Sequence, residues 1–192
     1  MLRRGYRVYA TAGSDSHAEL GNESLTSVYA ATCNGTKCDG SCNSAECVGY
    51  DKGNMITQLQ KGDYAAGNVA IQMCIYDGDN TTRMGGNCDF SGNKRLVVSV
   101  GNILNSSNLK DSHTYRVDIV NENGVVYSQF INPSVTTTIA LDVQDCAYYF
   151  VEVYDINHAT STKHSQNDYI KYPTGLISAV GNPIWNDEYT WQ

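Results

Sequence analysis

Two side chains that commonly bind metal ions lie two residues apart near the start of the sequence, in Gly13-Ser14-Asp15-Ser16-His17. A carboxylate and an imidazole suit Zn²⁺, Mn²⁺ or Fe at a hydrolytic site, where paired metals clamp a phosphoryl group and activate a water. Two ligands do not complete such a site, and residues 1–12 contain no His, Asp, Glu or Cys. We therefore expect Asp15 and His17 to form a turn without a working metal, and we expect no cofactor in this chain by itself.

The sequence also contains seven cysteines, which can form disulfides or bind a metal ion. Four lie in one loop-forming segment, at Cys33, Cys38, Cys42 and Cys47. Zinc-binding cysteines usually come as close pairs separated by a longer stretch, whereas these are evenly spread. Two local disulfides in any of three pairings are the preferred interpretation, and a four-cysteine metal site is the alternative. Cys74 and Cys88 bracket a polar loop and are predicted to staple a hairpin, which leaves Cys146 unpaired or paired in another scheme.

Four glycosylation sequons accompany the cysteines, with acceptors at Asn22, Asn34, Asn80 and Asn105. Sequons arise by chance in a chain rich in Asn, Ser and Thr, but with a dense cysteine loop they indicate the extracellular space or the cell surface. The basic start of the chain, residues 1–4, is not followed by an apolar segment, so no signal peptide is predicted there.

Charge and hydropathy narrow the class of partner. The formal net charge is −7, which argues against nucleic acid, because phosphate binding needs a basic face. No apolar run approaches the ~18 residues that would indicate a membrane span. Fourteen tyrosines indicate a surface for contacts to a partner or to glycans, or simply ordinary strand composition.

The segment from Gly5 to His17 resembles the last metal-binding motif of the polymerase-and-histidinol-phosphatase (PHP) family of metal-dependent phosphoesterases. In that family the Asp and His of a Gly-Ser-Asp-x-His motif lie at the end of a late strand of a TIM-like barrel. The resemblance implies that Asp15 and His17 are ligands of a divalent transition metal and that the other ligands lie upstream. It extends to a helix ending in Lys61-Gly62 and to the tail at residues 181–185, where Gly181 replaces the usual Ser.

Alternating and apolar runs predict a mainly β chain. The predicted strands are 5–13, 24–31, 69–76, 95–101, 114–121, 124–131, 135–142, 147–154 and 176–180. Residues 121–124, Asn-Glu-Asn-Gly, predict a tight hairpin. The single convincing helix is 51–62, which Gly62 can end. Apart from the resemblance, the alternative interpretation of the segment after 176–180 is a strand that ends in an Asn-Pro turn.

These elements predict an antiparallel β-sandwich at residues 63–192, preceded by two barrel-like strands and one short helix at 1–62. One functional hypothesis is a secreted, non-catalytic structural or interaction protein that assembles into a filament through its N-terminal strand, because an unpaired strand tends to pair with another chain. The alternative is the C-terminal part of a PHP-type phosphoesterase whose remaining metal ligands lie outside this chain.

Overall fold

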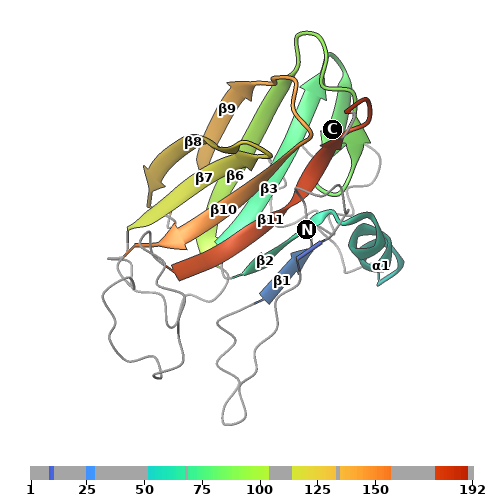
Figure 1. The fold of residues 1–192 in the computed structure, drawn as a ribbon. Helices are drawn as coiled ribbons and strands as arrows, with labels where there is room; N and C mark the ends of the chain where they lie inside the picture. The colour runs from blue at the N-terminus through green and yellow to red at the C-terminus, as the bar shows by residue number, and fades with distance from the viewer. Residues whose placement is uncertain are drawn as a thin grey trace, which may run out of the picture.

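The computed structural model describes residues 9–10, 25–28, 52–67, 69–103, 114–132, 135–156 and 176–189. Within these residues the chain folds into two β-sheets that pack face to face, with one short helix beside them (Figure 1). The prediction of a mainly β, sandwich-like fold with one short helix is therefore confirmed.

The larger sheet has seven strands, and six of them follow one another in the order β1-β2-β11-β10-β7-β8 with antiparallel neighbours. The seventh, β5, pairs with the end of β11 in parallel. The bounds in sheet order are β1 Leu25–Val28, β2 Tyr64–Gly67, β11 Leu176–Asn186, β10 Tyr148–Asp155, β7 Tyr115–Asn121, β8 Gly124–Ile131 and, beside β11, β5 Asn87–Cys88.

The smaller sheet has four antiparallel strands in the order β4-β3-β6-β9. Their bounds are β4 Asn80–Arg83, β3 Val69–Asp77, β6 Arg95–Ile103 and β9 Thr137–Asp142. Strands β8 and β9 are thus outer strands of the two sheets, as β1 and β4 are at the opposite ends, and β8 and β9 both lie on the left side of the sandwich in Figure 1.

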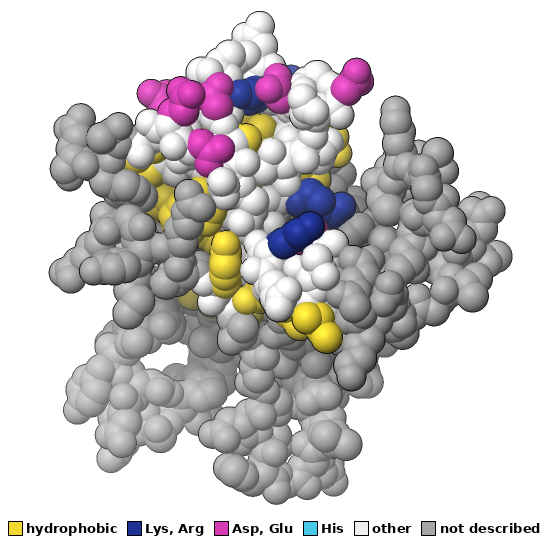
Figure 2. Space-filling model, turned by 90° about the vertical axis from the view of Figure 1, so that its right-hand side faces the viewer, with side chains coloured by type: hydrophobic (Ala, Val, Ile, Leu, Met, Phe, Trp, Pro, Cys, Tyr) yellow, Lys and Arg dark blue, Asp and Glu magenta, His cyan; other side chains and the backbone are white. Residues whose placement is uncertain are grey.

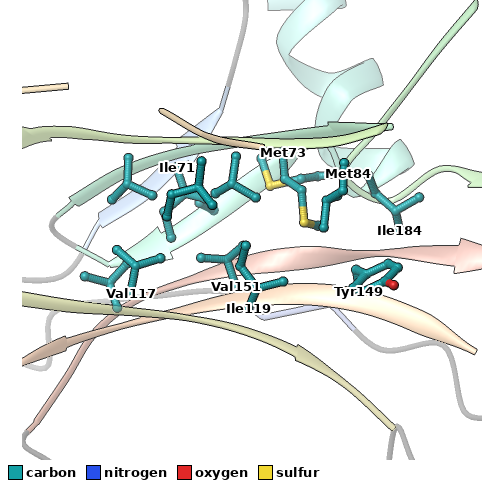
Figure 3. Packing of buried hydrophobic residues seen from close by; sticks show 14 of the residues in the cluster. Ile71, Met73, Met84, Val117, Ile119, Tyr149, Val151 and Ile184 are labelled. Atoms are coloured by element: carbon teal, nitrogen blue, oxygen red, sulfur yellow. The ribbon is translucent and has the colours of Figure 1, made fainter. Parts of the chain in front are cut away.

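Alternation along the strands builds the core between the sheets. In β3 every second residue from Val69 to Ile75 is buried, and in β10 the predicted apolar face of Tyr149, Val151 and Val153 is buried as well. These side chains meet between the two layers, as Figure 3 shows for Ile71 and Val151. Because a shift of one residue would turn each apolar set to solvent, this pattern also determines the strand register.

The helix α1 covers Lys52–Lys61 and ends as predicted. Gly62 has a φ of 79°, its N–H donates to the Leu59 carbonyl, and the Asp63 N–H donates to the Gln58 carbonyl. This pair of bonds is a Schellman motif, in which a left-handed residue satisfies the last carbonyls of a helix. The motif directs the chain from α1 straight into β2.

Two hairpins follow from their turn residues. Strands β7 and β8 are joined by Glu122 and Asn123, with Asn121 opposite Gly124, so the predicted hairpin is confirmed. Gly78 and Asp79 form the turn between β3 and β4, and Gly78 has a φ of 58°. Positive φ in a two-residue hairpin turn is accessible to glycine without steric cost.

Strand β11 does not end at the Asn-Pro pair, which corrects the sequence-based expectation. Asn182 and Pro183 together face Phe150, since Tyr149 pairs with Ile184 and Val151 with Gly181. A bulge of this kind leaves the extra residue out of the ladder, so the missing N–H of proline costs no hydrogen bond. The strand therefore continues to Asn186.

The start of the chain is described only at Tyr9 and Ala10, and both lie outside any strand. The Tyr9 hydroxyl donates to the Gly85 carbonyl at 3.2 Å, and the Ala10 N–H donates to Asn182 Oδ1 at 2.8 Å. These two residues of the predicted strand 5–13 thus form hydrogen bonds with their own chain.

Contacts also cross the predicted boundary at residue 62, since β1 pairs with β2. The division into two domains stays a prediction.

Candidate interaction surface

Most of the residues predicted to form sites lie outside the described residues. This holds for Asp15 and His17, for the cysteines at 33, 38, 42 and 47, and for the sequons at 22, 34 and 105. Asn80 is described, and it is exposed at the first residue of β4. Within the described part of the chain, no three His, Cys, Asp or Glu side chains come together as metal ligands. In the same part, no helix is long and apolar enough to cross a bilayer.

The predicted staple between Cys74 and Cys88 is not formed, and both thiols are free. Cys74 faces Arg83 across β3 and β4, whereas Thr82 faces Ile75. Successive side chains of a strand point to opposite faces, so Cys74 and Thr82 are on opposite sides of this hairpin. The Cys88 thiol is hydrogen-bonded to Thr82 and packs against the core. The two thiols therefore lie on opposite sides of the hairpin.

Cys146 is buried and free, in line with the unpaired alternative. Its thiol lies 3.5 Å from the Tyr148 carbonyl, to which it donates. Burial raises the pKa of this thiol to about 12, so it stays protonated at neutral pH. A buried neutral thiol is a poor nucleophile, and Cys146 accordingly acts as a small core residue.

The most unusual surface of the described chain is the open edge of β8. Among the described residues this strand pairs only with β7, and its eight residues, Gly-Val-Val-Tyr-Ser-Gln-Phe-Ile, carry no charge. Exposed fractions are 57% for Val125, 43% for Val126 and 63% for Phe130. Edge strands are usually protected by charged residues, proline or short length, because their free N–H and C=O groups invite another strand. Strand β8 has none of these three protections, although one β-bulge interrupts it.

A bulge explains why two consecutive valines are exposed. Ile119 pairs with Tyr127 and Val120 pairs with Val125, so Val126 has no partner of its own in β7. A bulge interrupts the regular alternation of faces at the extra residue. Val125 and Val126 are consequently both exposed, and from Tyr127 onward the alternation resumes, with Ser128 and Phe130 on the outer face.

The outer face beside β8 is polar, and Arg116 and Asp118 form an ion pair on it. Arg116 Nη2 lies 2.7 Å from Asp118 Oδ2, and the Ser128 hydroxyl donates to Asp118 Oδ1 at 2.6 Å. The Arg116 guanidinium also lies over the ring of Tyr154, 5.0 Å from its centroid. Paired charges of this kind do not need further neutralisation by a partner. The surface next to the open edge is slightly acidic, because Glu152 of β10 lies opposite Asp118 and its carboxylate accepts a hydrogen bond of 2.7 Å from the Tyr154 hydroxyl.

The inner face of β8 is unusual as well, because it holds a polar side chain where an apolar one is expected. Gln129 is on this face, where its Oε1 accepts a hydrogen bond of 3.0 Å from the Tyr127 hydroxyl. An amide thus points inward while Phe130 points outward, the reverse of the usual pattern in a half-buried strand. The sequence-based interpretation identified this strand but not its role as an open edge. The signal that could have indicated it is an eight-residue strand without any charge.

Comparisons with known proteins identify no relative of this chain. No family model, no curated protein and no solved structure matches this chain. The resemblance to the PHP family therefore stays a prediction that rests on the quoted residues alone.

Proposed function

We propose that this protein is a non-catalytic interaction protein of the extracellular space that self-associates by pairing β8 with β8 of a second copy. The observation that carries the proposal is the open edge of β8, which is uncharged and has three exposed apolar side chains. Strand addition satisfies the free backbone groups of an edge and buries its apolar side chains in one step. The extracellular location rests on the cysteine loop and the sequons, of which Asn80 is exposed.

The second copy is the preferred partner because β8 is complementary to itself. In an antiparallel pair, a residue whose N–H and C=O point toward the partner strand must face a residue with the same orientation. When the two strands are identical, the two-fold axis therefore passes through a residue and not midway between two residues. A two-fold axis at Ser128 places Val126 opposite Phe130 of the second copy, and this pair occurs twice. No like charges face each other, since β8 has no charge.

The expected affinity is low. An aromatic and a β-branched residue directly opposite each other contribute roughly 0.2–1 kcal/mol per pair, and the two copies supply two such pairs. One added strand buries less than the roughly 1,200–2,000 Å² typical of stable complexes. We therefore expect a weak, reversible dimer.

The proposal assigns self-association to β8 and not first to the N-terminal strand, because Tyr9 and Ala10 bond to their own chain. A two-fold pairing of β8 closes on itself and gives a dimer. A filament would need a second, different contact. The N-terminal segment remains the candidate for that contact, and the filament stays a prediction.

The test is sedimentation velocity over a range of protein concentrations. Wild-type protein is expected to show a dimer, and Val126→Lys with Phe130→Lys is expected to be monomeric, because the register places lysine opposite lysine. Val126→Glu with Phe130→Lys places opposite charges face to face and is expected to restore the dimer. Thr138→Lys with Ala140→Lys, on the exposed face of β9, is the matched control and is expected to leave the dimer intact.

Each result decides the proposal. A wild-type monomer at millimolar concentration contradicts self-association. A dimer that survives the two lysines in β8 shows that another surface makes the contact. Failure of the opposite charges to restore a dimer rejects the register about Ser128.

A further inference from the structure

Strand β10 carries aromatic side chains on both of its faces, although only one face lies in the core. It is an inner strand of the larger sheet, between β7 and β11. Its core-facing residues alternate with Phe150, Glu152 and Tyr154, which are half-buried on the outer face. Outward positions of an antiparallel strand are usually polar when that face meets only solvent. Two aromatic rings at such positions indicate that the outer face of β10 is a contact surface.

The neighbouring strands add apolar side chains beside both rings. Phe150 lies opposite Val120 of β7, which in turn lies opposite the exposed Val125 of β8. Tyr154 lies opposite Ile177 of β11, whose side chain is 44% exposed. Side chains directly opposite each other in a sheet are on the same face. The outer face therefore has two apolar positions, which are about 13 Å apart along β10.

An acidic position separates the two apolar ones. Glu152 lies midway between the rings and faces Asp118 of β7. Asp118 is paired with Arg116, whereas within the described part of the chain the Glu152 carboxylate accepts one hydrogen bond, 2.7 Å long, from the neutral Tyr154 hydroxyl. Like charges directly opposite each other destabilise a sheet. Two carboxylates and one guanidinium leave one excess negative charge, which is complementary to a single basic side chain.

The charge of the whole chain favours a basic partner as well. The formal net charge is −7, and Figure 2 shows acidic side chains gathered near the upper end of the side on which α1 lies. Excess charge of one sign attracts an oppositely charged partner at long range. Arg116 shows how a guanidinium fits this face, since it lies 5.0 Å from the centroid of the Tyr154 ring while its Nη2 is 2.7 Å from Asp118 Oδ2. A ring and a carboxylate together thus hold a basic group there.

The spacing along β10 determines the conformation of the partner. In an extended chain, side chains two residues apart are on the same side and about 6.6 Å apart, as Phe150, Glu152 and Tyr154 are. A helix would need a continuous apolar stripe, which the acidic position interrupts. We propose that the outer face of β10 binds an extended segment of a partner protein, in which one basic residue is flanked two positions away on each side by apolar residues. This surface does not depend on the proposed self-association, because strand addition at β8 extends the sheet sideways and leaves its outer face open.

The experiment uses the full chain and the synthetic peptide acetyl-Ser-Leu-Ser-Arg-Ser-Leu-Ser-amide, followed by amide chemical shifts. Saturable binding in the millimolar range or tighter is expected, with shifts in β7, β10 and β11. The same peptide with glutamate in place of arginine should bind at least tenfold more weakly, because it brings a like charge to Glu152. The peptide acetyl-Ser-Ser-Leu-Arg-Leu-Ser-Ser-amide has the same composition, but adjacent side chains of an extended chain point to opposite sides. A several-fold loss of affinity is expected for it.

Three variants test the contact. Glu152→Lys should reverse the preference, so that the arginine peptide binds at least tenfold more weakly and the glutamate peptide binds more tightly than it does to the wild type. Ile177→Ser changes an exposed apolar residue, and a several-fold loss for the arginine peptide is expected even if Glu152→Lys is poorly folded. Asp142→Lys, at an exposed acidic residue of β9, is the matched control and should leave both affinities unchanged.

Several results would overturn the assignment. These are no shifts at about 5 mM peptide (close to the weakest binding that such titrations resolve), shifts that fall outside the outer face of the larger sheet, and equal binding of the arginine and glutamate peptides. A folded Glu152→Lys protein with unchanged preference would also reject it. Shifts on this face that depend on protein concentration alone, in Val126→Lys with Phe130→Lys, would show that the occupant is a second copy and not a partner protein.

Discussion

Strands β8 and β9 are both outer strands on the same side of the sandwich (Figure 1). Their exposed faces carry different types of residue. In β9 the apolar residues Ile139 and Leu141 belong to the inner face, and the exposed positions hold Thr138, Ala140 and Asp142. In β8 the aromatic ring of Phe130 is exposed and Gln129 is on the inner face.

The two edges also differ in charge. Asp142 of β9 is exposed and lies 3.4 Å from Arg95 of β6, so this edge presents a charged pair to solvent. Strand β8 presents none. Charge on an edge strand opposes pairing with another chain, and its absence permits it. The comparison shows that one edge of the sandwich has a residue pattern expected for a monomer, whereas the other has a pattern expected for an interface.

The largest expected effect concerns the core side of β9. Ile139→Ala should lower the free energy of unfolding by about 2–4 kcal/mol, because it removes buried methyl groups and leaves a cavity. Val126→Ala in β8 should change it by less than about 0.5 kcal/mol. Urea unfolding of dilute protein measures both values, and equal losses would show that the two edges do not differ as described.

The next effect concerns association. Phe130→Ser should weaken the dimer by about 2- to 30-fold, since the change removes two apolar contacts of roughly 0.2–1 kcal/mol each. The stability of the monomer should hardly change, because Phe130 is largely exposed. Sedimentation equilibrium provides the dissociation constant, and Ala140→Ser in β9 serves as the control. An unchanged dissociation constant would place the interface elsewhere.

Transferring the pattern of β8 to β9 should create a second open edge. Thr138→Phe with Asp142→Val adds an exposed ring and removes the charge that faces Arg95. We expect species larger than a dimer at high concentration, because each subunit then has two edges that accept a strand. Light scattering detects them, and a variant that remains dimeric would show that charge and side chain alone do not determine which edge is used.

The smallest expected effect is that of Asp142→Ala alone. The Asp142 carboxylate and the Arg95 guanidinium are both exposed, and exposed ion pairs contribute roughly 0–1 kcal/mol. Thermal unfolding should therefore show a loss of less than about 0.5 kcal/mol, lower still at high salt. A larger loss would mean that this pair stabilises β9 and does not merely protect the edge.

Local residue patterns determined much of the fold. Alternation located β3, β6, β7, β8, β9 and β10, and the Asn-Glu-Asn-Gly turn set the β7–β8 hairpin because it supplies a residue that accepts positive φ. Gly62 likewise determined the end of α1. Each of these signals acts over a few residues, so it can be recognised without knowledge of the rest of the chain.

Long-range contacts decided what the sequence did not show. Strand β2, Tyr-Ala-Ala-Gly, has no alternation and exists because β11 and β1 pair with it on both sides. Strand β11 continues past Pro183 because a β-bulge leaves this position out of the hydrogen-bond ladder, so the missing N–H of proline costs no bond. Cys74 and Cys88 bracket one loop in the sequence, yet the strand geometry separates them. The open edge of β8 and the aromatic outer face of β10 arise in the same way, since pairing and burial depend on residues that are distant along the chain.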